Sequence, residues 1–159
     1  MVHRGIARLA GALIVCFLLL SHADPQFFLL HLYQSLIYLA IILMLFYFED
    51  HWAYMIGMLA PAVWLLLTYA TGLLGGATRQ ISRVVSGSAS LNELSLLAAT
   101  TAILSVLMIV FCAHRWRREY AGLGKGRSTF IVSLLIVVAY YAILVIWFWR
   151  EIPQNPATG

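Results

Sequence analysis

The chain has 159 residues, of which 63% are hydrophobic and 10% are charged, and its mean hydropathy is +0.92. These values exclude a soluble globular domain, because such domains carry about 25% charged residues. The formal net charge is +4, but the basic residues lie between apolar runs. They therefore report membrane orientation and lipid contact, and they give no support for a nucleic-acid partner.

The first apolar run, at about residues 6–21, follows the short basic segment Met1–Arg8 and supports two interpretations. It fits a signal peptide, because Ser21-His22-Ala23 places small residues at the two positions that direct cleavage. It equally fits a short first transmembrane helix that Asp24-Pro25 ends. We favour the retained helix, since multi-pass membrane proteins seldom need a cleaved leader.

Four longer runs follow, at about residues 26–48, 54–76, 94–113 and 130–149. Each contains 20 or more residues and no charged side chain, which is enough to cross a bilayer at a rise of about 1.5 Å per residue. The predicted fold class is therefore all-α: a polytopic integral membrane protein with a bundle of four long transmembrane helices plus a short N-terminal one. Residues 1–159 form a single transmembrane domain, with residues 151–159 expected as a short disordered tail.

Lysine and arginine residues are distributed unevenly between the two sides that five spans define. Seven lie on the side of the N-terminus and three on the other. By the positive-inside rule, we expect a cytoplasmic N-terminus, an external C-terminus and a location in the bacterial cytoplasmic (inner) membrane. The basic loop between residues 114 and 128 is expected to contact anionic lipid headgroups through Arg115, Arg117, Arg118, Lys125 and Arg127.

Small residues predict where the helices pack closely. Gly72 and Gly76 form a GxxxG pair at the end of the third helix, and Ala98 and Ala102 lie one turn apart on the fourth. We interpret both pairs as packing positions inside the bundle, with packing against another subunit as the alternative. Pro61 lies inside the third helix and predicts a kink, because proline removes a backbone donor and presses on the preceding turn.

Polar side chains inside the spans are the best indication of a site, since they are costly in lipid. Four residues of the second helix recur at positions i, i+3, i+4 and i+7, which places them on one face, and two tyrosines of other helices lie at a similar depth. The candidate ligand-binding residues are His31, Gln34, Ser35, Tyr38, Tyr69 and Tyr141. This layer could bind a quinone or a lipid. Alternatively, its members hydrogen-bond one another and hold the bundle together, or they contact a partner subunit.

Metal and catalytic chemistry have little support. Glu49, Asp50 and His51 are consecutive, and His114 lies at the same predicted membrane boundary. Carboxylates and imidazoles can bind metal ions. The spacing does not fit a metal site, because adjacent helical residues point in different directions and no second pair lies one turn away. We therefore predict no metal site and no catalytic residue. An enzyme is disfavoured, and Asp50 with His51 would be the candidate pair if the protein modified lipids.

Long helices with short loops and no decisive site favour a small accessory or scaffolding subunit of a larger membrane complex, with an energy-converting complex as one option. Other membrane subunits and lipids are then the expected partners, and no cofactor is predicted beyond a possible quinone or bound lipid. A redox subunit that binds a quinone or a lipid through the His31–Tyr38 face is the alternative. A small transporter comes next, disfavoured because no carboxylate, lysine or arginine lies inside the four long spans.

Overall fold

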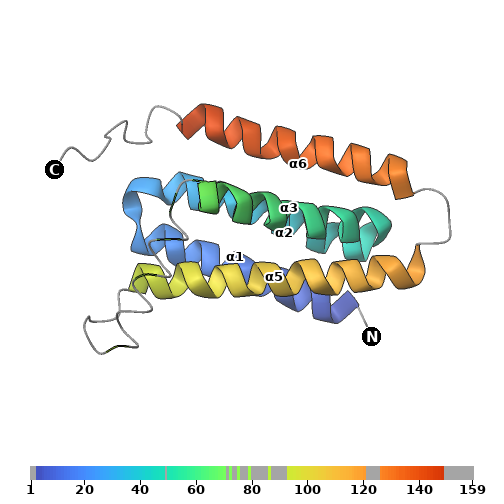
Figure 1. Ribbon diagram of the computed structural model, residues 1–159, viewed down its shortest axis with the longest axis horizontal. Coiled ribbons are helices and arrows are strands. Elements are labelled where there is room, and N and C mark those ends of the chain that lie inside the picture. Colours follow the sequence, from blue (N-terminus) through green and yellow to red (C-terminus); the bar gives the residue numbers. More distant parts are fainter. Residues whose placement is uncertain are drawn as a thin grey trace.

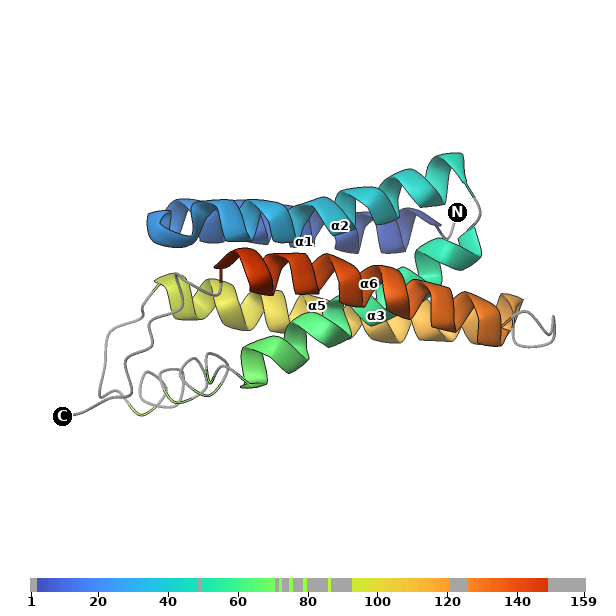
Figure 2. The same cartoon turned by 90° about the horizontal axis from the view of Figure 1, so that it is seen from above.

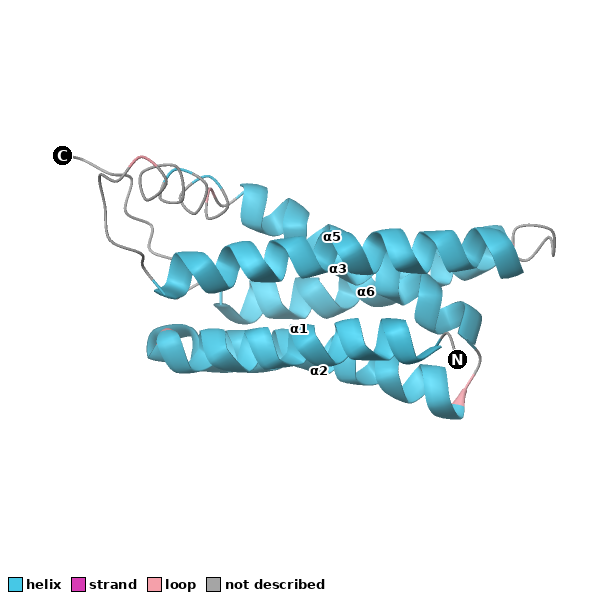
Figure 3. Cartoon of the chain, turned by 90° about the horizontal axis from the view of Figure 1, so that it is seen from below, coloured by secondary structure: helices cyan, strands magenta, loops and turns pink. Residues whose placement is uncertain are grey.

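The computed structural model describes residues 3–48, 50–70, 93–120 and 126–148, together with Gly72, Gly75, Arg79 and Ser86. This part of the chain is almost entirely helical and contains no strand (Figure 3). Five helices are long and apolar enough to cross a membrane. They are α1 (His3–Ala23), α2 (Phe28–Tyr47), α3 (Asp50–Ala70), α5 (Glu93–Glu119) and α6 (Gly126–Phe148), with a 3-10 turn, η1 (Pro25–Phe27), before α2. The predicted all-α membrane bundle is confirmed.

The five helices run roughly antiparallel to their neighbours in sequence (Figure 1). The start of α1, the α2–α3 junction, the end of α5 and the start of α6 lie at one end of the bundle. We call this the basic end. Helices α1 and α2 form a hairpin on one side, and α3, α5 and α6 lie on the other (Figure 2). Helix α3 contacts α2, α5 and α6, while α1 contacts α2 and α5, so α6 lies at an edge of the bundle.

Helix α1 has 21 residues, which is as long as its neighbours, because it extends beyond both ends of the apolar run at 6–21. One face of α1 is buried at helical spacing. Its buried residues include Ile6, Ala10, Leu13, Phe17 and Leu20. The Phe17 ring stacks on Tyr38 of α2 at a centroid distance of 5.6 Å and meets Trp64 of α3 edge to face at 5.6 Å. Helix α1 is therefore part of the core.

Helices α5 and α6 extend beyond their apolar runs. We predicted a loop from residue 114 to 128, but α5 continues to Glu119 and α6 begins at Gly126. Hydropathy reports the part of a helix that suits hydrocarbon, whereas a helix can continue into water on polar residues. Arg115 and Glu119 stabilise this extra turn through an i,i+4 ion pair of 3.1 Å.

Helix α3 ends earlier than predicted, at Ala70 and not at residue 76. Gly72 follows in a turn with φ of 75°, a conformation that glycine adopts without steric cost. A Cβ there would meet nothing within 4 Å, so Gly72 is not a helix-packing position, and Gly76 lies outside the described residues. On α5, Ala98 and Ala102 are half-buried, and Ala102 packs against the core. The tail at 151–159 also lies outside the described residues.

Gly57 lies where α3 and α5 approach each other closely. A Cβ on Gly57 would lie 2.8 Å from the Cys112 sulfur and 3.3 Å from the terminal carbon of Met108. Pro61, one turn later, is buried within the same continuous helix. Glycine is therefore required here for helix packing, as in other membrane bundles where small residues let helices come together.

Candidate functional site

The polar face predicted on α2 points into the bundle. Gln34, Ser35 and Tyr38 are buried and His31 is half-buried. The Ser35 hydroxyl donates to the carbonyl of Leu32 at 2.7 Å, and His31 Nδ1 lies 3.3 Å from Oε1 of Gln34. Three of the four predicted residues therefore find partners on their own helix, and Tyr38 is the one that reaches other helices.

Tyr38 extends from α2 to a point between α5 and α6. Its side chain has no exposed surface, and its hydroxyl lies near the hydroxyls of Ser105 on α5 and Tyr141 on α6. The Tyr38 hydroxyl interacts electrostatically with the other two. None of the three makes a hydrogen bond of regular length and angle to any described residue. We call Tyr38, Ser105 and Tyr141 the hydroxyl cluster.

The hydroxyl cluster fills a region where helix backbones do not meet. Among the described residues, no Cα atom of α5 lies within 8 Å of one in α2 or α6. Figure 1 shows α6 and α5 on opposite sides of the α2–α3 layer. Long side chains close this space, because a tyrosine spans a distance that small residues would leave empty. We predicted from the sequence that Tyr38 and Tyr141 lie at a similar depth, and in the structure their hydroxyls lie near each other.

A second pair of tyrosines joins α2 to α6 beside the cluster. The Tyr33 hydroxyl donates to the Tyr140 carbonyl at 3.3 Å, and the Tyr140 hydroxyl donates to the Tyr33 carbonyl. The two rings stack with centroids 4.4 Å apart and planes 17° from parallel. Each carbonyl has a second lone pair free for such a bond. The reciprocal arrangement satisfies both phenols at once.

Sequence reasoning included one tyrosine that lies elsewhere and missed two residues of the site. Tyr69 is 74% exposed near the end of α3, so the structure does not bring it to the cluster. Ser105 and Tyr33 were not singled out. The signal for Ser105 was its spacing from Thr101, since the two residues lie one turn apart on the buried face of α5. Thr101 bonds back to the Leu97 carbonyl at 2.8 Å.

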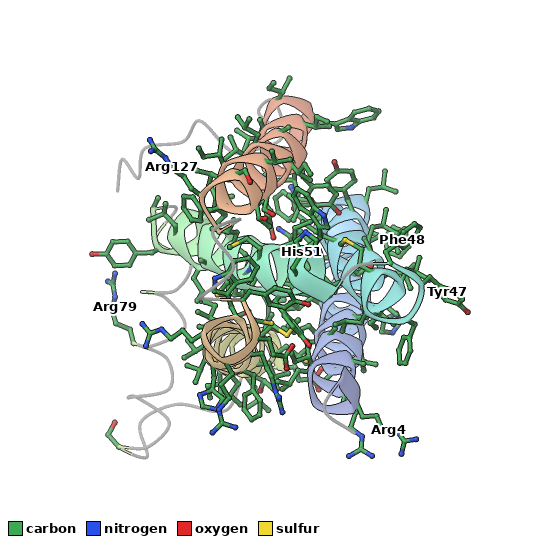
Figure 4. The ribbon with its side chains drawn as sticks, turned by 90° about the vertical axis from the view of Figure 1, so that its right-hand side faces the viewer. Arg4, Tyr47, Phe48, His51, Arg79 and Arg127 are labelled. Atoms are coloured by element: carbon green, nitrogen blue, oxygen red, sulfur yellow. The ribbon has the colours of Figure 1, made fainter. Side chains whose placement is uncertain are left out.

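Aromatic side chains gather at the basic end. Figure 4 views this end and shows His51 near its centre, with Tyr47 and Phe48 directed away from it. The His51 ring lies 5.2 Å from Trp52 and 5.8 Å from Tyr120. His114 is exposed on α5, and no group of three or more histidine, cysteine, aspartate or glutamate residues in the described ranges could hold a metal ion.

The predicted headgroup-binding arginines also lie at the basic end. Arg117, Arg118 and Arg127 are exposed, and Arg115 makes its ion pair with Glu119. Lys125 lies outside the described residues. Exposed guanidinium groups at a helix end are suited to phosphate, which they bind through two parallel hydrogen bonds.

The buried polar groups do not run continuously along α6. Ser133 and Tyr141 lie on the same face, eight residues and about 12 Å apart along the helix axis. Val137 lies between them and is fully buried, as is Met108 on α5, one turn from Ser105. In the described helices, an apolar layer therefore separates Ser133 from the hydroxyl cluster.

Taken by its chemistry, the hydroxyl cluster supplies donors and acceptors of neutral hydrogen bonds and holds no charged group. Cys16 and Cys112 are buried free thiols on α1 and α5.

Comparison of the chain with family models, with curated proteins and with solved structures finds no match.

Proposed function

We propose that this chain is an accessory or scaffolding subunit of a larger membrane assembly. The observation that supports this function best is the outer face of α6. Helix α6 lies at the edge of the bundle, where it contacts α3 and only slightly α2, and much of its apolar surface is exposed. Its exposed large apolar residues are Phe130, Ile131, Val132, Leu135, Ile136, Val138, Ile143, Ile146 and Trp147.

The composition of this face suits contact with another helix. Five of its nine large residues are the β-branched Ile and Val between 131 and 143, which have one strongly preferred rotamer in a helix. Docking such side chains loses little conformational entropy, so a rigid apolar face binds a partner helix at lower cost than a flexible one. Helix α5 contributes a second outward face, on which Ile103, Val106 and Val110 are exposed.

We propose that the basic end faces the cytoplasm. Among the described residues, Arg4, Arg8, Arg117, Arg118 and Arg127 are exposed on the helix ends that lie there, and Arg79 follows the end of α3, which lies at the other end of the bundle (Figure 1). This asymmetry follows the positive-inside rule. The same arginines then lie at the depth of anionic headgroups, where each basic residue adds about 1 kcal/mol of attraction.

Site-specific photo-crosslinking in the native membrane tests the subunit role. A benzophenone amino acid at Val138 on α6 should give a discrete protein adduct, and the chain should purify with a stoichiometric partner in mild detergent. Val15 on α1 is the matched control, since its exposed fraction is 54% and that of Val138 is 49%. Lipid adducts alone at Val138, with the chain purified alone and monodisperse, would overturn the proposal.

A further inference from the structure

The hydroxyl cluster leaves hydrogen-bonding capacity unused inside the membrane span. Tyr38 and Ser105 have no exposed surface and Tyr141 is 2% exposed, yet none of their hydroxyls is paired with regular geometry among the described residues. Polar groups without partners are costly in an apolar surrounding. A bound molecule that supplies a hydrogen-bonding partner would remove this cost.

A partner with a hydrogen-bond acceptor suits the chemistry of the cluster. Two phenols and one serine each present an O–H donor. The nearby carbonyls of Tyr33 and Tyr140 already accept from the other tyrosine's phenol. An oxygen that accepts from two donors, as a carbonyl does, would satisfy both phenols without introducing a charge.

The position of the cluster restricts the partner further. Tyr141 lies seven residues before the end of α6 at Phe148, about 10 Å along the helix axis, so the partner must be soluble in lipid. The surroundings are aromatic: the Phe17 ring stacks on Tyr38, and the Tyr140 ring meets Tyr141 edge to face at 5.6 Å. Flat rings pack well against such surfaces.

The Tyr33 and Tyr140 side chains join α2 to α6 beside the cluster. These two helices are joined by the Tyr33–Tyr140 pair with little backbone contact, and rotation of two side chains is an easier opening than separation of packed helices. We propose that the phenols of Tyr38 and Tyr141, beside the Ser105 hydroxyl, donate hydrogen bonds to the carbonyl oxygen of a flat, lipid-soluble molecule of the quinone class, which enters between α2 and α6. This site is independent of the accessory role.

Binding of decylubiquinone to the purified full chain tests the proposal. The probe should raise the midpoint of thermal unfolding, and decylbenzene, which has a similar tail and no carbonyl, should not. Tyr38→Phe, Tyr141→Phe and Ser105→Ala should each weaken binding about three- to tenfold, the loss of one hydrogen bond. Tyr69→Phe is the matched control, because Tyr69 is 74% exposed, and it should bind as the wild type does.

Several results would overturn the site. These are no rise with decylubiquinone in the wild type, an equal rise with decylbenzene, or an equal dissociation constant in the wild type and in the Tyr38→Phe/Tyr141→Phe double variant. Ser105→Ala removes one oxygen and decides the question if the tyrosine variants do not fold.

The stability of the ligand-free protein provides a second readout. If the Tyr141 hydroxyl is unpaired without ligand, Tyr141→Phe should leave the unfolding midpoint unchanged or raise it. Tyr33→Phe removes a hydroxyl that does make a hydrogen bond, so it should lower the midpoint. An equal loss in both variants would show that the cluster is already satisfied from within, and it would reject the ligand site.

Discussion

The close approach of α3 to α5 makes Gly57→Ala the sharpest test of the helix packing. The added methyl would lie 2.8 Å from the Cys112 sulfur and 3.3 Å from the Met108 terminal carbon, whereas non-bonded atoms favour about 3.5–4.0 Å. Met108 can move its flexible end, but Cys112 is fully buried and has little freedom. The two helices must therefore separate.

Overpacking of this kind costs about 1–3 kcal/mol, and the higher helix propensity of alanine returns up to about 1 kcal/mol. We expect Gly57→Ala to lower the free energy of unfolding by about 1–2 kcal/mol. Gly11→Ala on α1 is the control for propensity, since a Cβ there would meet nothing within 4 Å. That variant should be as stable as the wild type or more so.

Cys112→Ala should rescue the overpacked variant. Once the sulfur is removed, the nearest remaining atom of residue 112 is the Cβ, at 3.9 Å from the methyl built on residue 57, which is an ordinary contact. Cys112→Ala alone leaves a small void and should cost about 1 kcal/mol. The double variant should be more stable than the sum of the single effects predicts, by about 1–2 kcal/mol.

Equilibrium unfolding of the purified chain in mixed micelles, followed by circular dichroism over a titration with a denaturing detergent, measures all four variants. Wild-type stability for Gly57→Ala would refute the close approach of α3 to α5. Strictly additive losses in the double variant would show that the clash, if present, is not with Cys112.

Three further predictions concern other parts of the bundle. Tyr33→Phe should destabilise the chain by about 1 kcal/mol in the same unfolding titration, because it removes the hydrogen bond to Tyr140 and leaves that carbonyl bonded within its helix. The intact mass of chain purified from its native membrane should include residues 1–23, because Phe17 belongs to the core; a mass that lacks them would mean a cleaved signal peptide. Glu119→Gln should change stability by less than about 0.5 kcal/mol, since its ion pair is partly exposed, and a loss above 1 kcal/mol would contradict this.

Hydropathy was sufficient to predict the fold class and the approximate location of each span, because lipid admits few alternatives to an apolar helix. Hydropathy predicted the ends of the helices less accurately. At the end of α5 the helix continues over charged residues that hydropathy assigns to a loop, and after α3 the run of small apolar residues past Ala70 reads as helix although Gly72 turns the chain. Hydropathy measures the solvent that a residue prefers and does not measure backbone conformation.

Helical periodicity predicted which α2 residues share a face, and it could not tell which of them reach another helix. Ser35 and Tyr38 both point inward, but the short serine side chain bonds its own backbone while the tyrosine extends to Ser105. The site could be predicted only in part, because its other members depend on which helices are neighbours. That information comes from tertiary packing.

The edge position of α6 has a consequence for the way the protein enters the membrane. Helices leave the ribosome in chain order, and α1 and α2 can pair as a hairpin as soon as both are inserted. Helix α3 then finds α2, and α5 completes a closed unit by contacting both α1 and α3. None of these contacts involves α6. This helix packs against the surface of α3 that is already assembled, and Tyr33 and Tyr140 join it to α2. Helix α6 therefore joins the other four helices after they have assembled, and its outer face is available to a partner.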